Sequence, residues 1–160
     1  MKHYLKYLSY LVPLLLLFSS SCVKNETCVS SNNNLRIGLY KVETDTTFTA
    51  ATLDSLTVYF EGLEDSLVYN NEAGVSSIEI PLSDTTENLT IVLKINDGVD
   101  YMQLNYKPYF VFRSTECGVI NRYEIDDVRC TGNKVRALYL ENIDIDESEA
   151  VNLFMVVDID

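Results

Sequence analysis

The chain of 160 residues contains no tryptophan, three prolines, six glycines and a single histidine, His3. Because that histidine lies in the basic start of the chain, neither a Ser-His-Asp nor a Cys-His nucleophile system is available to the rest of it. The sequence also lacks a glycine-rich phosphate loop and a dinucleotide-binding fingerprint. Its four cysteines are scattered without the spacing of a zinc site. We therefore expect no enzymatic activity, no cofactor and no metal site.

Positive charge is also scarce, because 12 lysines and arginines face 24 aspartates and glutamates, a net charge of −12. This acidic balance argues against nucleic acid, and against an anionic membrane, as an electrostatic partner. The acids are dispersed, with one cluster at Asp144, Asp146, Glu147 and Glu149. Carboxylate clusters can bind Ca²⁺, but this one lacks the central glycine and the loop frame of an EF-hand. We interpret it as a solvated acidic turn.

The first 22 residues have the order of an export signal. Two lysines precede an apolar run at 11–18, and three serines then lead to Cys22. The run is shorter than the roughly 20 apolar residues that a membrane-spanning helix needs, so the pattern indicates a secretory signal. Small residues before an obligatory cysteine resemble the bacterial lipobox, in which the thiol is alkylated by a diacylglyceryl group. Such a lipid on Cys22 anchors a chain stably; an ordinary signal peptide cleaved nearby is the alternative.

We therefore predict three parts: a signal peptide at 1–21, a lipidated N-terminus and tether at 22–34, and one domain at 35–160. The mature chain is long enough to bury a real core. Its predicted location is the cell envelope, lipid-anchored at the outer membrane on either the periplasmic or the surface-exposed face. The membrane is then a partner through Cys22.

From residue 35 onward the hydrophobic pattern has a period of two, which is typical of strands. Strands are expected at 35–40, 56–60, 66–69, 78–82, 89–95, 101–113, 119–125, 135–145 and 151–159. Pro81 indicates an edge strand and Pro108 a bend or bulge. Turn signals lie at 96–98 and at Asp126-Asp127. The spacing predicts an all-β fold, a single antiparallel β-sandwich (immunoglobulin-like or a similar Greek key) of about eight or nine strands. A closed barrel is the alternative.

Three cysteines remain if Cys22 carries lipid: Cys28, Cys117 and Cys130. An odd number in an oxidising compartment predicts one disulfide and one spare thiol. A bond between Cys28 and Cys117 would tie the N-terminal segment to the sheet. A bond between Cys117 and Cys130 would instead close a hairpin, and the spacing leaves both open.

Two further patterns concern glycans. Four tyrosines of the C-terminal half, Tyr101, Tyr106, Tyr109 and Tyr123, either line a sugar-binding platform or fill half-buried strand positions. The short Asp-Ser-apolar motifs at Ser55 and Ser66 resemble envelope O-glycosylation sites. Ordinary turn chemistry of Asp and Ser is the alternative reading of both motifs.

Several short stretches resemble an uncharacterised family of β-rich bacterial lipoproteins with a lipobox signal peptide, a domain of unknown function. The stretches are Cys22 with Cys28 shortly after it, Arg36-Ile37-Gly38-Leu39-Tyr40, Ile78-Glu79-Ile80-Pro81-Leu82-Ser83 and Ser114-Thr115-Glu116-Cys117-Gly118. The resemblance implies an exported, sandwich-like domain and no known activity. It also implies pairing of Cys28 with Cys117, which favours that disulfide, and leaves Cys130 outside the pattern.

These observations lead to two functional expectations. The first is a lipid-anchored envelope protein that acts without catalysis as a structural or interaction module, with a protein or glycan partner that the sequence does not identify. The second is a surface lipoprotein that binds a glycan or another ligand.

Overall fold

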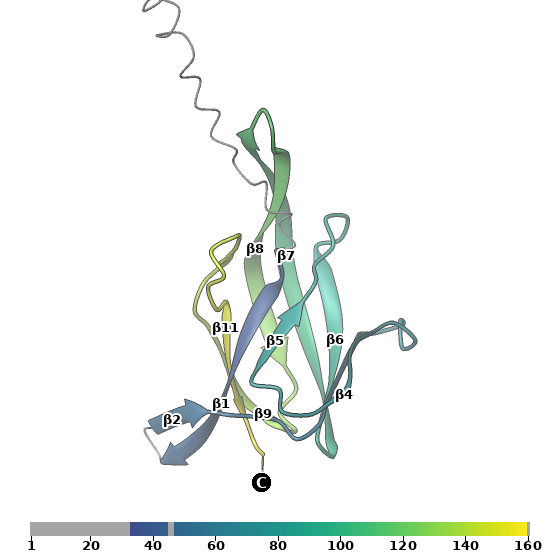
Figure 1. Cartoon of the computed structure of the whole chain (residues 1–160). Coiled ribbons are helices and arrows are strands. Elements are labelled where there is room, and N and C mark those ends of the chain that lie inside the picture. The colour runs from purple at the N-terminus through teal and green to yellow at the C-terminus, as the bar shows by residue number, and fades with distance from the viewer. Residues whose placement is uncertain (1–32, 45–46, 160) are drawn as a thin grey trace, which may run out of the picture.

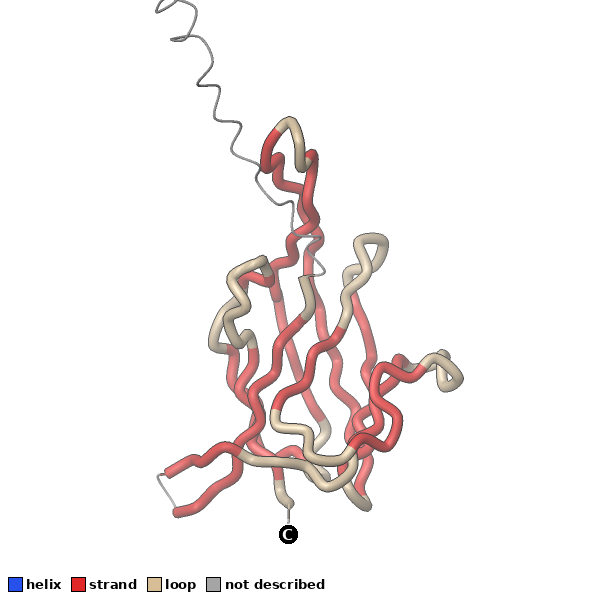
Figure 2. The backbone as a smooth tube through the Cα atoms, viewed as in Figure 1, coloured by secondary structure: helices blue, strands red, loops and turns tan. Residues whose placement is uncertain are grey.

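The computed structural model describes residues 33–44 and 47–159, and this part of the chain folds into two packed β-sheets without a helix (Figures 1 and 2). The strands are β1 (Leu35–Thr44), β2 (Thr47–Ala50), β3 (Leu56–Phe60), β4 (Leu67–Glu72), β5 (Ser77–Ile80), β6 (Asn88–Ile95), β7 (Gly98–Ser114), β8 (Gly118–Cys130), β9 (Val135–Leu140), β10 (Asp144–Ile145) and β11 (Leu153–Val157). The predicted β-sandwich is confirmed, with eleven described strands rather than eight or nine. Within these residues no helix is long and apolar enough to cross a membrane.

The first sheet is built around β1, the first strand of the domain. One edge of β1 pairs with β11, and its other edge pairs with β5 near the start and with β2 near the end. β9 continues the sheet beyond β11. The β1–β11 pair is parallel, which departs from the antiparallel arrangement predicted throughout. The first and last strands of the domain therefore run side by side in the same direction, close to the middle of one sheet.

The second sheet is antiparallel, in the order β10-β8-β7-β6-β3-β4. Its centre is the β6–β7 hairpin, in which eight residue pairs from Asn88↔Asn105 to Ile95↔Gly98 are in register. The predicted turn lies at Asn96 and Asp97, and Asn96 takes the left-handed conformation with φ of 51°. Asparagine tolerates this conformation better than most residues do, which explains the tight connection.

The core fills the space between the sheets with the alternating apolar side chains that the sequence indicated. The first sheet contributes Leu35, Ile37 and Leu39 of β1, all essentially inaccessible to solvent, and the second contributes Ile91 and Leu93 of β6. Burial of a side chain of this size stabilises a fold by about 1.5–3 kcal/mol. Because alternate side chains of a strand point to opposite faces, the intervening polar residues lie on the outside.

Three details of the strand prediction were wrong. Asp126 and Asp127 do not form a turn but lie within β8, where Asp126 pairs with Lys107 of β7 at 2.8 Å and Asp127 with Arg129 at 3.0 Å. The predicted strand 135–145 divides into β9 and β10, which belong to different sheets. β2 was not predicted, because Thr47–Ala50 has no apolar stripe.

Pro108 sits inside β7, and the bulge lies close by rather than at the proline. The β7–β8 register shifts between Asn105 and Tyr106, where β8 carries one extra residue. The Tyr106 amide donates to Glu87 O on the β6 side of β7. Amides two residues apart in a strand point to the same side, so the N–H that Pro108 lacks would point to the β6 side of β7. β6 begins at Asn88, opposite Asn105, and therefore has no residue that could pair with position 108. Proline is therefore tolerated there.

Beyond Pro108, β7 and β8 continue as a two-stranded hairpin that projects from the sandwich. We call residues 109–122 the arm. Its strands pair from Tyr109↔Arg122 to Ser114↔Gly118. Figures 1 and 2 show the arm extending past the other strands at one end of the molecule, whereas β2 lies at the opposite end.

Candidate functional site

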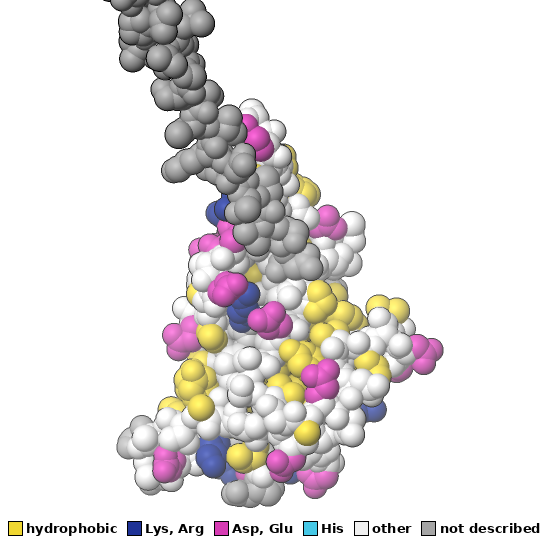
Figure 3. All heavy atoms as spheres, viewed as in Figure 1, with side chains coloured by type: hydrophobic (Ala, Val, Ile, Leu, Met, Phe, Trp, Pro, Cys, Tyr) yellow, Lys and Arg dark blue, Asp and Glu magenta, His cyan; other side chains and the backbone are white. Residues whose placement is uncertain are grey.

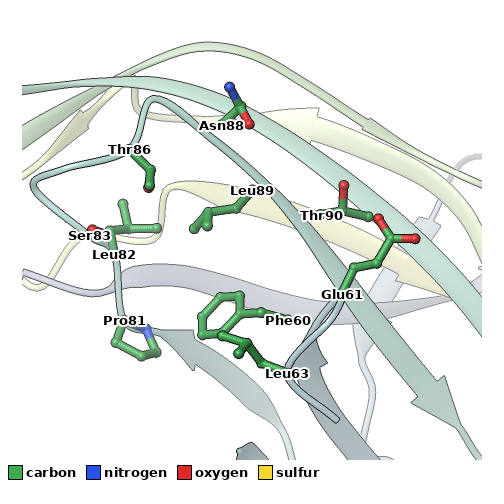
Figure 4. Close-up of a pocket in the computed structure, with 10 residues that line it drawn as sticks. All are labelled: Phe60, Glu61, Leu63, Pro81, Leu82, Ser83, Thr86, Asn88, Leu89 and Thr90. Carbon is green, nitrogen blue, oxygen red and sulfur yellow. The ribbon is translucent and has the colours of Figure 1, made fainter.

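The described part of the chain contains an open groove of about 610 Å³, formed by the end of β3, the β5–β6 loop and the start of β6. Its apolar wall consists of Phe60, Leu63, Pro81, Leu82 and Leu89. Its polar rim consists of Glu61, Ser83, Thr86, Asn88 and Thr90. Figure 4 shows the ring of Phe60 beside Leu63, with Leu82 and Ser83 on the opposite side of the groove and the carboxylate of Glu61 beside Thr90. On the surface, hydrophobic side chains gather beside β5 while acidic ones are scattered (Figure 3).

The wall on the β3 side is set by a tight turn. Gly62 takes φ of +81°, a conformation that favours glycine. The Leu63 amide donates to Phe60 O at 2.9 Å, and the Glu61 amide donates to Thr90 O at the same distance. The turn is thereby fastened to β6, and Leu63 is left more than half exposed at the mouth of the groove.

The opposite wall is held by a tyrosine from the core. Tyr106 is completely buried, and its hydroxyl donates to Ser83 O at 2.9 Å and accepts from the Ser83 amide at 3.2 Å. The same hydroxyl lies 2.9 Å from Thr86 Oγ1. Tyr123 packs edge-to-face on Tyr106, with 5.6 Å between ring centroids, and its hydroxyl donates to Leu82 O at 3.3 Å. Burial, followed by the nearby Asp84 carboxylate, raises the pKa of Tyr123. Both hydroxyls thus order the loop at 81–86.

The chemistry of the groove is that of a binding surface. Its lining combines five apolar side chains with hydroxyl and amide groups and a single carboxylate, that of Glu61. The volume falls within the range of about 300–1,000 Å³ that small-molecule sites occupy. A ligand with an apolar face and several hydrogen-bonding groups matches this lining.

The four tyrosines predicted as a possible platform do not form one surface. Tyr106 and Tyr123 are in the core, where they hold the groove loop. Tyr101 is exposed on the outer face of β7, and Tyr109 lies at the base of the arm beside Arg122. Burial and the nearby Asp144 raise the pKa of Tyr109, while Arg122 opposes them.

A different aromatic cluster, which the sequence analysis missed, covers the outer face of the first sheet. Tyr40 stacks on Phe154 with 3.6 Å between ring centroids and an interplanar angle of 7°, and Phe48 and Tyr139 contact Phe154 edge-on. Gly38 permits this stacking, since a Cβ there would approach the Tyr40 ring to 3.0 Å. The only signal in the sequence was the i, i+2 spacing of Gly38 and Tyr40, because the other rings come from distant strands.

The acidic cluster after β10 is a turn held by local contacts. Glu147 pairs with Arg122 at 2.8 Å and Glu149 approaches Arg36 at 3.8 Å. Hydrogen bonds from Ser148 lower the pKa of Asp146. Burial works against ionisation of Glu147, but the hydrogen bond from Arg122 and other contacts outweigh it and lower its pKa. Within residues 33–44 and 47–159, no group of three or more His, Cys, Asp or Glu is placed to hold a metal ion.

The two cysteines of the described residues lie at opposite ends of the β7–β8 hairpin. Cys117 lies in the turn at the tip of the arm and is not a free thiol, whereas Cys130 lies at the far end of β8, opposite Met102, and is free. Burial is the main cause that raises the pKa of Cys130 to about 12. A Cys117–Cys130 disulfide is therefore wrong. Cys22 and Cys28 lie outside the described residues, so the lipid and the Cys28–Cys117 bond stay predictions.

The two predicted O-glycosylation sites differ in access. Ser55 is half-buried before β3, and its Oγ lies 2.6 Å from Asn71 Oδ1. Ser66 is exposed in the loop between β3 and β4. Modification of either residue stays a prediction.

Two packed sheets, a preformed apolar groove with a hydrogen-bonding rim, and a projecting arm define the class of this chain as a β-sandwich module with a potential binding surface. The chain belongs to the family described as "Family of unknown function (DUF6452)", whose match covers residues 55–156. The match includes β3 to β10 and most of β11 and leaves β1 outside it. No curated protein and no solved structure matches the chain.

Proposed function

We propose that this chain is a lipid-anchored protein of the cell envelope, held at the outer membrane by Cys22, that acts as an interaction module without catalysis. The observation that carries the proposal is the order of the first 22 residues, in which a basic start, an apolar run and three serines precede Cys22. The membership of residues 55–156 in a family of unknown function is compatible with this role and assigns no activity.

The place where the chain enters the sandwich supports the anchor. Asn33 is buried at the start of the described residues, and its side-chain amide donates to the Asn121 carbonyl at the base of the arm. Asn33 is eleven positions after Cys22, and a fully extended chain of that length spans at most about 40 Å. An anchor at Cys22 would therefore keep the domain close to the lipid surface, with the arm end nearest to it.

The experiment is a comparison of Cys22→Ser with the matched control Cys130→Ser, each expressed as the full chain. Cys22→Ser is expected to leave the membrane fraction and to lose metabolic labelling with a fatty acid. Cys130→Ser removes a thiol that is free and half-buried, and it is expected to remain in membranes with its label. Retention of both membrane association and lipid label by Cys22→Ser would overturn the proposal.

Ligand binding is the second candidate function, and the groove favours it. The loop at 81–86 is fixed by the Tyr106 hydroxyl before any ligand arrives, so little ordering cost accompanies binding. A glycan fits the lining by chemistry, because its apolar ring faces can pack on Phe60 and Leu89 while its hydroxyls meet the polar rim.

The groove is tested by titrating envelope oligosaccharides into the purified protein. Leu63→Glu at the mouth is expected to abolish binding, whereas Val99→Glu, at a similarly exposed apolar residue outside the groove lining, is expected to leave it unchanged. Equal binding by both variants would exclude the groove as the site.

A further inference from the structure

The arm carries an apolar face that no described residue covers. Phe110 is 64% exposed, Phe112 66% and Val119 59%. Phe112 lies directly opposite Val119 in the β7–β8 ladder, and Phe110 is two residues before Phe112. Side chains that are opposite each other or two residues apart share one face of a hairpin. The three side chains therefore form a single apolar patch, which we call the arm patch.

The arm patch continues the core-facing side of the second sheet. In β7, Met102, Leu104 and Tyr106 point into the core and are fully buried, and the same alternation leads to Phe110 and Phe112. The first sheet does not cover these last two, because its strand β1 begins only at Leu35. A two-stranded ribbon with exposed aromatic rings is marginal by itself in water, and exposed apolar patches commonly mark interaction sites.

We propose that the arm patch inserts into the lipid surface to which Cys22 is anchored, so that the domain contacts the membrane at two places. This inference rests on the lipid anchor proposed above. The described chain begins at Asn33, whose side-chain amide donates to the Asn121 carbonyl on the arm itself. From Asn121 the arm reaches four residues further, about 13 Å, at the end of the molecule opposite β2 (Figure 1).

Charge on the arm is compatible with lipid headgroups, unlike the charge of the whole chain. Residues 109–122 contain Arg113, Arg122 and Glu116, a formal net charge of +1, and Arg122 is paired with Glu147 at 2.8 Å, so the projecting part is close to neutral, whereas the whole chain carries −12. Arginine side chains beside apolar residues are typical of surfaces that lie in a membrane interface. The acidic balance that argues against membrane attraction overall is therefore absent from this hairpin.

The chain's own tether is a poorer cover for the patch. Residues 23–32 are Val-Lys-Asn-Glu-Thr-Cys-Val-Ser-Ser-Asn, in which two valines are the only aliphatic side chains. Burying two phenylalanine rings under such a segment would also take its polar groups out of water, which offsets the gain from covering the rings. A lipid surface offers both rings an apolar environment when the arm lies along it with the arm patch facing inward, and the polar tip then stays at the headgroups.

The absence of tryptophan from the sequence provides the test. Phe112→Trp, made in the full chain and purified with its lipid, introduces the single indole at the patch. Phe48→Trp is the matched control, because Phe48 is also an exposed aromatic residue but lies on β2 at the other end of the molecule. Each protein is mixed with phosphatidylethanolamine–phosphatidylglycerol vesicles, with or without bromine on the acyl chains.

The expected result is a blue shift of the indole emission at position 112 on adding vesicles, with loss of intensity in brominated lipid and no change at position 48. Phe110→Trp should behave like Phe112→Trp, which guards against misfolding of one variant. The inference is overturned if the protein floats with the vesicles while position 112 stays unquenched. It is also overturned if the emission is already blue-shifted without lipid, which indicates cover by the tether, or shifts with protein concentration, which indicates a second copy. Failure to float at all would contradict the anchor instead.

Discussion

At the scale of single residues, Asp100 is a fully buried carboxylate near the start of β7 that accepts four hydrogen bonds. Its Oδ1 accepts hydrogen bonds from Thr131 Oγ1 and the Asn133 amide, both at 2.8 Å. Its Oδ2 accepts from the amides of Lys134 and Val135 at 2.6 and 3.0 Å. One side chain thus fixes the loop between β8 and β9. Burial works against its ionisation, but these four hydrogen bonds together lower the pKa of Asp100.

Replacing Asp100 by asparagine should destabilise the domain by about 2–4 kcal/mol, because an amide would face two backbone donors with an N–H group of its own. The matched control is Asp54→Asn, at an exposed carboxylate before β3, for which a change within about 0.5 kcal/mol is expected. Urea unfolding at neutral pH measures both. A wild-type midpoint for Asp100→Asn would contradict the structural role.

The same residue predicts a pH dependence with a defined sign. Since the folded-state pKa of Asp100 is lowered, its ionisation contributes stability above the unfolded pKa of about 3.9, and this contribution is lost as the pH falls through the lower folded value. The difference in unfolding free energy between wild type and Asp100→Asn should therefore shrink between about pH 4 and pH 2. A difference that grows on acidification would contradict the lowered pKa.

Asn152 is another buried polar residue whose hydrogen bonds hold the fold together, in this case by linking the two sheets. Its Oδ1 accepts from the Arg36 amide of β1 at 3.1 Å, and its Nδ2 donates to Asp144 O of β10 at 2.8 Å. β1 and β10 belong to different sheets, so this buried amide joins the two layers at one end of the sandwich. The sequence analysis placed Asn152 only within the predicted strand 151–159 and gave no sign of this role.

At the scale of elements, the groove depends on a contact between the core and the loop at 81–86. Tyr106→Phe removes the hydroxyl that bonds Ser83 and Thr86 while keeping the ring in the core. We expect a loss of about 1–2 kcal/mol and faster amide hydrogen exchange at Ser83. Tyr101→Phe, at an exposed ring on the outer face of β7, should change neither quantity. Unaltered exchange at Ser83 in Tyr106→Phe would show that the hydroxyl does not hold the loop.

The sequence predicted most strands of this fold because local alternation is visible within a short window. Leu56 to Phe60 and Leu89 to Ile95 were predicted within a residue of their observed limits. Partners across the sheets could not be predicted, because the β1–β11 pair joins residues more than a hundred positions apart. β10 could not be predicted for the same reason. Its two residues lie at the end of the predicted strand 135–145, and only their pairing with β8 places them in the other sheet.

The groove could not be predicted from the sequence for a related reason. Its lining comes from a turn, a loop and the start of a strand, between Phe60 and Thr90, each of which looks like an ordinary connection. The decisive residue, Tyr106, lies outside that range and acts from the core. The sequence analysis placed Tyr106 either in a platform or at a half-buried strand position, and neither reading put it beneath a loop.

At the scale of the whole molecule, the described elements give the domain two distinct ends. The arm and the start of the described chain at Asn33 lie at one end, and the β1–β2 hairpin lies at the other (Figure 1). The loop of the groove is tied to the arm end, since Asn121 donates to Asp84 at 3.1 Å. If the arm meets the lipid, the groove loop lies towards the membrane-proximal half of the domain.

The central claim, attachment through Cys22, is tested most directly by the mass of the N-terminal peptide of the mature protein isolated from membranes. The account predicts a chain that begins at Cys22 and carries a diacylglyceryl group on its thiol and an acyl group on its amine. A mature chain that begins at another residue, or one that begins at Cys22 with an unmodified thiol, would contradict it.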